Sequence, residues 1–143
     1  MNHPSGDPDY AVLARFRHLI RRFLVFSEPA ARAAGLQPQQ HQLLLAVKGL
    51  PKGLRPTILT LSERLQLKHH TVVGLVDRMV RRGLLVRGRD LNRADLREVL
   101  LRISAKGERA LRALSLIHRE ELRRVGREIL PALEKIVGGR RRV

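Results

Sequence analysis

A short basic stretch at the expected start of a helix carries the side chains best suited to chemistry in this sequence. Lysine and histidine can donate hydrogen bonds to the O6 and N7 acceptors of guanine in the major groove of duplex DNA, and histidine can also bind phosphate. Further along this helix stand Val73, which could touch a thymine methyl group or simply pack, and Arg78, which suits a backbone phosphate. We therefore expect DNA contacts from Lys68, His69, His70, Thr71, Val73 and Arg78.

The adjacent histidines His69 and His70 would also suit a metal site. Neighbouring residues on a helix, however, point about 100° apart, and no carboxylate or further histidine stands at ligand spacing nearby. The sequence also lacks a recognisable set of nucleophile, base and orienting group, and a phosphate-binding loop. We therefore expect a protein that is not an enzyme and that holds neither a metal nor a cofactor.

The net charge favours an anionic partner. The chain has 29 Lys and Arg against 13 Asp and Glu, a formal net charge of +16. Such a charge suits DNA, RNA or an anionic membrane surface, although an arginine-rich proteome would also produce it. All four aromatic residues lie between Tyr10 and Phe26, whereas sheet-type binders of RNA and single strands need aromatic platforms for base stacking. Duplex DNA needs no such platform.

The sequence contains no cysteine, which excludes disulfides, thiolate metal sites and redox-sensing thiols. The N-terminal residues lack the basic head and apolar run of a signal peptide. No apolar segment is long enough to span a bilayer. We therefore expect a soluble, cytoplasmic protein without a membrane partner.

A second basic group lies in a polar segment between two short β-prone stretches, Leu84–Arg87 and Val99–Ile103. This pattern predicts a two-stranded hairpin with a charged tip. Arginines on a narrow tip can enter the minor groove, where the potential is most negative, and Asp95 can pair with Arg97 two residues on. A merely solvated hairpin is the alternative. The candidate DNA contacts are Arg89, Arg93, Asp95 and Arg97.

Apolar residues at helical spacing predict the elements that carry these two groups. A first helix starts at Asp9, with a bend or an end at Pro29. A second starts near Pro38, which suits a first helical position, and stops at Gly49. A third covers roughly residues 58–67.

The ends of the later helices also carry sequence signals. Thr57 or Thr60 could cap the third helix. The fourth ends at Arg82-Gly83, and its basic last turn is either solvated or in contact with DNA. Ser104 caps a long helix after the hairpin.

This long helix is interrupted by Pro131 and followed by a last short helix in our prediction. Two short helices joined by a tight turn and followed by a basic hairpin are typical of a winged helix-turn-helix. We therefore predict a mainly α fold with a small β-hairpin.

The sequence resembles the MarR (multiple antibiotic resistance regulator) family over nearly its whole length, from Tyr10 to Val137. The sharpest part of the resemblance is the Asp-x-Arg signature of the hairpin, at Asp95 and Arg97. The other matching segments are Thr57–Leu65, Thr71–Met79, Arg82–Leu85, Arg89, Val99–Ser104 and Gly107.

The resemblance implies a homodimeric transcriptional regulator in which the N- and C-terminal helices of two chains intertwine. It also implies a pseudo-palindromic operator with one recognition helix per half-site, and repression relieved by a small anionic or aromatic ligand. The dimer contacts expected from it are Phe16, Phe23, Ile129 and Ile136, and the ligand-pocket candidates are Arg15, Arg17, His18, His41 and Gln42. Either these five line a pocket or they are ordinary surface charges and cap residues.

The expected division of the chain follows from the same resemblance. It comprises a disordered N-terminus (1–8), dimerisation helices (9–35 and 104–137), a winged helix-turn-helix DNA-binding lobe (36–103) and a basic disordered tail (138–143).

Two features qualify the expected function. Val73 and Gly74 stand where the family more often has Thr or Ser and then Arg, so a usual contact could be missing, and His69 and His70 could replace part of it. The charge of the chain and its basic end, residues 140–142, would also suit a non-specific architectural DNA-binding protein.

Overall fold

The computed structural model describes residues 7–89 and 98–138, and the chain divides into two compact units. One unit, Ala30–Leu116, is called the lobe below. The other combines residues 1–29 with residues 117–143 and is called the helical unit. Two helices, α1 (Tyr10–Ala33) and α5 (Ala105–Val137), contribute to both units.

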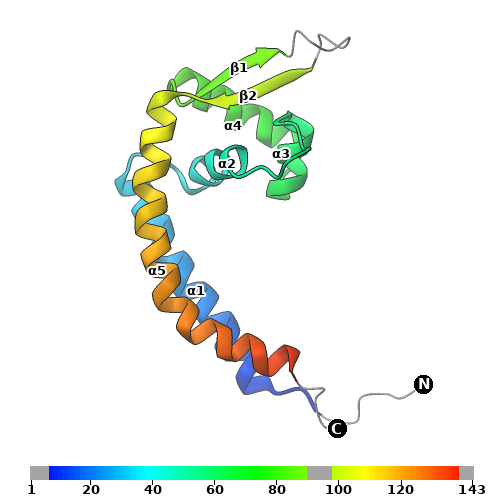
Figure 1. Ribbon diagram of the computed structural model, residues 1–143, viewed down its shortest axis with the longest axis vertical. Helices are drawn as coiled ribbons and strands as arrows, with labels where there is room; N and C mark the ends of the chain where they lie inside the picture. Colours follow the sequence, from blue (N-terminus) through cyan, green and yellow to red (C-terminus); the bar gives the residue numbers. More distant parts are fainter. Residues whose placement is uncertain (1–6, 90–97, 139–143) are drawn as a thin grey trace, which may run out of the picture. The chain divides into compact units, whose positions relative to one another are not determined.

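The lobe has a winged helix fold (Figure 1). It contains α2 (Pro38–Lys48), α3 (Ile58–Leu65), α4 (His69–Arg81), β1 (Leu85–Arg89) and β2 (Val99–Ile103), followed by the first part of α5. Apolar residues at helical spacing on α2, α3 and α4 meet the hairpin in one core, because each helix has a single apolar face. The largest fully buried side chains there are Leu36, Leu43, Leu44, Leu61, Val72, Val76, Met79, Leu84, Leu85 and Leu114.

Local capping interactions define the helix ends in the lobe. The side chain of Thr57 accepts a hydrogen bond from the backbone N–H of Thr60 at 3.2 Å, so Thr57 caps α3. The Ser104 hydroxyl accepts from the N–H of Gly107 at 3.0 Å at the start of α5, as predicted. Gly83 has a φ of 72°, which glycine adopts without strain and which ends α4.

The hairpin is antiparallel, with Leu85 opposite Ile103 and Arg89 opposite Val99. Leu101 points into the core and its N–H donates to the carbonyl of Pro56 at 2.9 Å. The second strand is therefore also attached to the loop between α2 and α3.

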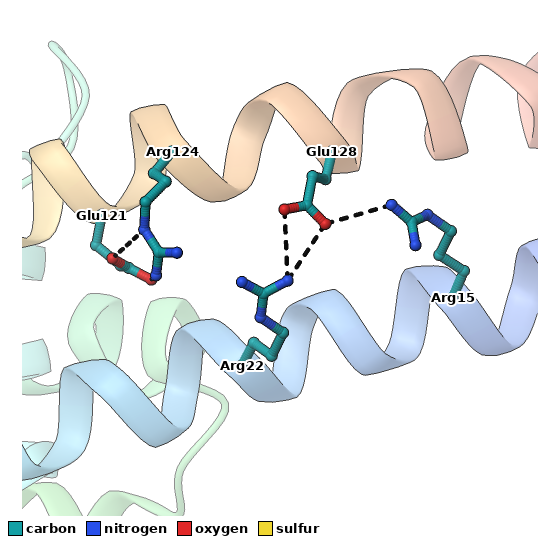
Figure 2. A network of polar contacts seen from close by, with 5 residues as sticks. All are labelled: Arg15, Arg22, Glu121, Arg124 and Glu128. Atoms are coloured by element: carbon teal, nitrogen blue, oxygen red, sulfur yellow. Dashed lines mark hydrogen bonds and ion pairs between the residues drawn. The ribbon is translucent and has the colours of Figure 1, made fainter.

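In the helical unit, α1 and the second half of α5 lie side by side (Figure 1). Leu19, Val125 and Ala132 are buried between them. Glu128 of α5 accepts hydrogen bonds from Arg15 at 3.3 Å and from Arg22 at 3.2 Å (Figure 2). These two ion pairs reinforce the small apolar contact between the helices.

A second acidic residue of α5, Glu121, is nearly buried and pairs within its own helix (Figure 2). Arg124 donates two hydrogen bonds to it, at 2.5 and 3.1 Å. The hydrogen bond with Glu121 and the negative charge of its carboxylate raise the pKa of Arg124.

Two predicted helix ends were wrong, and of the two alternatives at Pro29, a bend or an end, the structure excludes the end. The helix α1 continues through Pro29 to Ala33. The helix α5 continues through Pro131 to Val137, so the described residues contain no separate last helix. Both prolines are exposed, so water can satisfy the carbonyl groups that lose their helical partners. The helix α3 ends at Leu65, because Gln66 adopts a left-handed φ of 55°.

None of the helices in the described part of the chain is long and apolar enough to cross a membrane.

Candidate nucleic-acid interface

The basic stretch singled out from the sequence stands at the start of α4. Lys68 is the N-cap residue, with extended backbone angles, and His69 begins the helix. Lys68, His69 and His70 are all exposed, and Thr71 is partly exposed. The opposite face of the helix carries Val72, Leu75, Val76 and Met79, all buried in the core of the lobe.

A short turn holds this helix end in place. Gln66 has a left-handed backbone, and the N–H of Leu67 donates to the carbonyl of Ser62 at 3.1 Å. The side chain of Gln66 also donates to the Glu63 carbonyl at 2.9 Å. Such a conformation costs a non-glycine residue about 1–2 kcal/mol. The helix α4 therefore starts three residues after a mildly strained position.

The middle of α4 is partly exposed at Val73 and Gly74. Val73 is half-buried, so its side chain both packs and reaches the surface. Gly74 has the Arg78 guanidinium 3.8 Å from where a Cβ would stand. Arg78 itself is exposed in the last turn of the helix.

The hairpin presents further basic side chains. Arg87 and Arg89 are exposed on β1. Arg87 forms an ion pair with Asp77 of α4. The tip residues predicted to contact DNA, Arg93, Asp95 and Arg97, lie outside the described residues.

Arg82 has a role that sequence reasoning missed. Its guanidinium donates to the side-chain oxygen of Gln40 at 2.8 Å and to the carbonyl of Gly35 at 2.6 Å. Gln40 is only 5% exposed. The backbone carbonyl of Arg82 in turn accepts from Lys106 at 2.9 Å. The end of α4 is therefore attached to the start of α2 and to α5, and Arg82 is more than a solvated charge.

Positive charge is concentrated in the lobe. Ala30–Leu116 contains 17 basic and six acidic residues, a net charge of +11. The helical unit contains 12 basic and seven acidic residues, a net charge of +5, of which the C-terminal residues 140–142 supply three charges. An anionic partner is therefore attracted mainly to the unit that carries α4.

The expected ligand-pocket residues fall into both units. Arg15, Arg17 and His18 are exposed on α1, where Arg15 pairs with Glu128. His41 is buried in the lobe and Gln42 is exposed there. Neither unit by itself brings the five residues together.

The expected dimer contacts lie in a unit with much exposed apolar surface. Phe16, Phe23 and Ile129 are half-buried, and Ile136 is exposed. Large apolar side chains of this unit that are exposed include Tyr10, Leu13, Leu24, Val25, Ile117, Leu122, Leu130, Leu133, Ile136 and Val137.

Comparison with known proteins agrees with this arrangement. Residues 34–94, which run from the end of α1 into the hairpin, match the model of the MarR family. The match covers the greater part of the lobe and identifies this segment as MarR-like. The matched family is one of DNA-binding transcription regulators with a winged helix-turn-helix and not one of enzymes. No curated protein matches the sequence.

Several solved structures share the MarR fold at low sequence identity. The Staphylococcus aureus MepR–DNA complex is 18% identical, with a TM-score of 0.65 over 93% of this chain and 99% of MepR. AbsC from Streptomyces coelicolor is 16% identical, with a TM-score of 0.71 over 95% and 93% of the two chains. Staphylococcus aureus MarR in complex with salicylate and kanamycin is 16% identical, with a TM-score of 0.68 over 89% and 85%.

Proposed function

We propose that this protein is a MarR family transcription regulator that binds a pseudo-palindromic DNA operator as a homodimer, with the start of α4 from each protomer in the major groove. The observation that carries the proposal is the exposure of Lys68, His69 and His70 on a helix whose other face is buried. A fixed helix end with free donors can distinguish guanine by its O6 and N7 acceptors. Thr71, Val73 and Arg78 extend this surface along α4.

The hairpin supplies the second contact in this proposal. Arg89 is exposed on β1, and Arg93, Asp95 and Arg97 follow it in the sequence. Arginines inserted into a narrow minor groove respond to its negative potential. Asp95 and Arg97 are two residues apart in the sequence, a spacing at which a pair between them would orient the arginine and offset the repulsion between an aspartate and DNA.

Dimerisation is supported by the apolar surface of the helical unit. A soluble protein rarely leaves so many large apolar side chains exposed. A second copy covers these side chains, including Phe16, Phe23, Ile129 and Ile136, and presents two copies of α4 to two half-sites. Sedimentation equilibrium tests this part: a monomer at micromolar concentration contradicts it.

A competition assay tests sequence specificity. A duplex is first selected from a random-sequence library by the wild-type protein, and its binding is then challenged with excess random duplex at physiological salt. We expect the selected duplex to win by at least about 10³-fold. Equal competition would instead support a non-specific architectural DNA-binding protein.

We further propose that a small anionic aromatic molecule binds the dimer and releases it from the operator, so that the protein acts as a repressor. The support is the resemblance in fold to Staphylococcus aureus MarR, whose structure contains salicylate, together with exposed basic residues such as Arg17 and His18 on α1. A thermal-shift screen of phenolic acids tests this. Absence of any stabilising compound would leave Arg15, Arg17, His18, His41 and Gln42 as ordinary surface and packing residues.

A further inference from the structure

The two strands of the hairpin are each held by an ion pair to a different part of the lobe. On β1, Arg87 pairs with Asp77 of the recognition helix α4. Immediately before β2, Glu98 pairs with Arg55 of the loop between α2 and α3. The hairpin contributes the cation of the first pair and the anion of the second. Neither hairpin residue could therefore form the other's pair.

The register of the strands places the two pairs at different levels of the hairpin. Arg87 stands opposite Leu101 in the register of the two strands. Leu101 in turn donates its N–H to Pro56, the residue next to Arg55. The hairpin is therefore held at its middle, at Arg87 and Leu101, and again at Glu98, next to the Arg89–Val99 pair nearest the tip.

Acidic residues are scarce in this lobe, which makes the position of Asp77 informative. Four acidic residues of the lobe lie in its described part, namely Glu63, Asp77, Glu98 and Glu108. An acidic side chain on a recognition helix repels DNA and should lower affinity by itself. Three of the four are in ion pairs, whereas no ion pair of Glu63 is found within the described residues.

We propose that Asp77 and Arg55 are positioning residues for DNA binding, which hold the hairpin at a fixed angle to α4 through Arg87 and Glu98. This rests on the proposed function, because it assumes that α4 and the hairpin contact one duplex together. Both pairs are only partly buried, with side-chain exposures of 22–43%. They therefore contribute little to stability, and their main effect is to preorganise the hairpin before binding.

The test compares two neutralising variants that remove the same charge from the same lobe. Asp77→Asn breaks the pair with Arg87, whereas Glu63→Gln is the matched control on α3. Simple electrostatics predicts that each variant binds DNA as tightly as the wild type or more tightly. Our proposal predicts that Asp77→Asn weakens binding to the selected duplex by about fivefold, while Glu63→Gln does not weaken it.

Two further readouts separate positioning from a general loss of structure. The melting temperature of Asp77→Asn should stay close to that of the wild type. Hydroxyl-radical footprints should lose the protection given by the hairpin and keep the protection given by α4. Equal or tighter binding by Asp77→Asn, or uniform loss of the whole footprint, would overturn the proposal.

A double-mutant cycle shows whether Asp77 acts through Arg87. Arg87→Gln should weaken binding, and adding Asp77→Asn to it should cause no further loss. A further fivefold loss in the double variant would overturn the proposed route. If the wild-type protein selects no sequence at all, the proposed function fails instead, which is a different outcome from failure of the positioning role.

Discussion

Replacing Gly107 by alanine should destabilise the lobe, although alanine is the better helix former. A Cβ at this position in the first turn of α5 would stand 2.3 Å from the carbonyl oxygen of Leu84 and 2.7 Å from the Cγ2 of Ile103. The Leu84 carbonyl also accepts the N–H of Ser104 at 3.1 Å, so it cannot move away freely. Gly107 is thus required by close approach between α5 and the hairpin rather than by its backbone angles.

The expected magnitude follows from two opposing terms. Overpacking against backbone costs about 3 kcal/mol, at the upper end of the usual range. The higher helix propensity of alanine returns about 1 kcal/mol. We therefore expect a net loss of about 2 kcal/mol in the free energy of unfolding and a fall of roughly 5–10 °C in melting temperature.

Urea denaturation and calorimetry of the purified protein measure this effect, with Gly126→Ala as the matched control on the same helix. An added Cβ at Gly126 meets no atom of the described residues within 4 Å. That variant should be as stable as the wild type or more stable by about 0.5–1 kcal/mol. If the two substitutions changed stability equally, the packing of α5 against the hairpin would be incorrectly described.

Four other substitutions test separate features. Lys68→Ala should weaken binding to the selected duplex about tenfold without lowering the melting temperature, as measured by fluorescence anisotropy and calorimetry; an unchanged affinity would remove Lys68 from the interface. Arg82→Ala should lower the free energy of unfolding in urea by about 1–2 kcal/mol because Gln40 loses a charged donor, whereas the exposed neighbour Arg81→Ala should change it by less than about 0.5 kcal/mol. Thr57→Ala should cost about 1 kcal/mol through loss of the α3 cap, and a neutral effect in the same assay would contradict that role. Ile136→Glu should convert the dimer to monomers in sedimentation equilibrium, and a dimer of unchanged affinity would place the interface elsewhere.

The parts of the fold that could be predicted depend on local signals. The caps at Thr57 and Ser104 and the glycine after α4 act within a few residues of the helix ends that they define, so the sequence shows them directly. The continuation of α1 and α5 through Pro29 and Pro131 could not be read in this way. It depends on whether a helix is supported on both sides of the proline and on whether the freed carbonyls reach water, and both are properties of the packed structure.

The candidate site shows the same limit. The basic stretch at the start of α4 was visible because its residues are consecutive. The partners of Arg82, by contrast, are 42 and 47 residues away, at Gln40 and Gly35. The pairing of Asp77 with Arg87 had a weak signal, since the two opposite charges stand ten residues apart on consecutive elements. Choosing between that pairing and contact with DNA required the relative placement of α4 and β1.

The most direct test of the account uses the absence of cysteine from the sequence. His70→Cys creates a single thiol at the start of α4, to which an iron chelate that cleaves DNA can be attached. We expect discrete cleavage within the major groove of each half-site of the selected duplex, and no localised cleavage of a scrambled duplex. Equal, scattered cleavage of both duplexes would contradict the claim that this end of α4 reads DNA sequence.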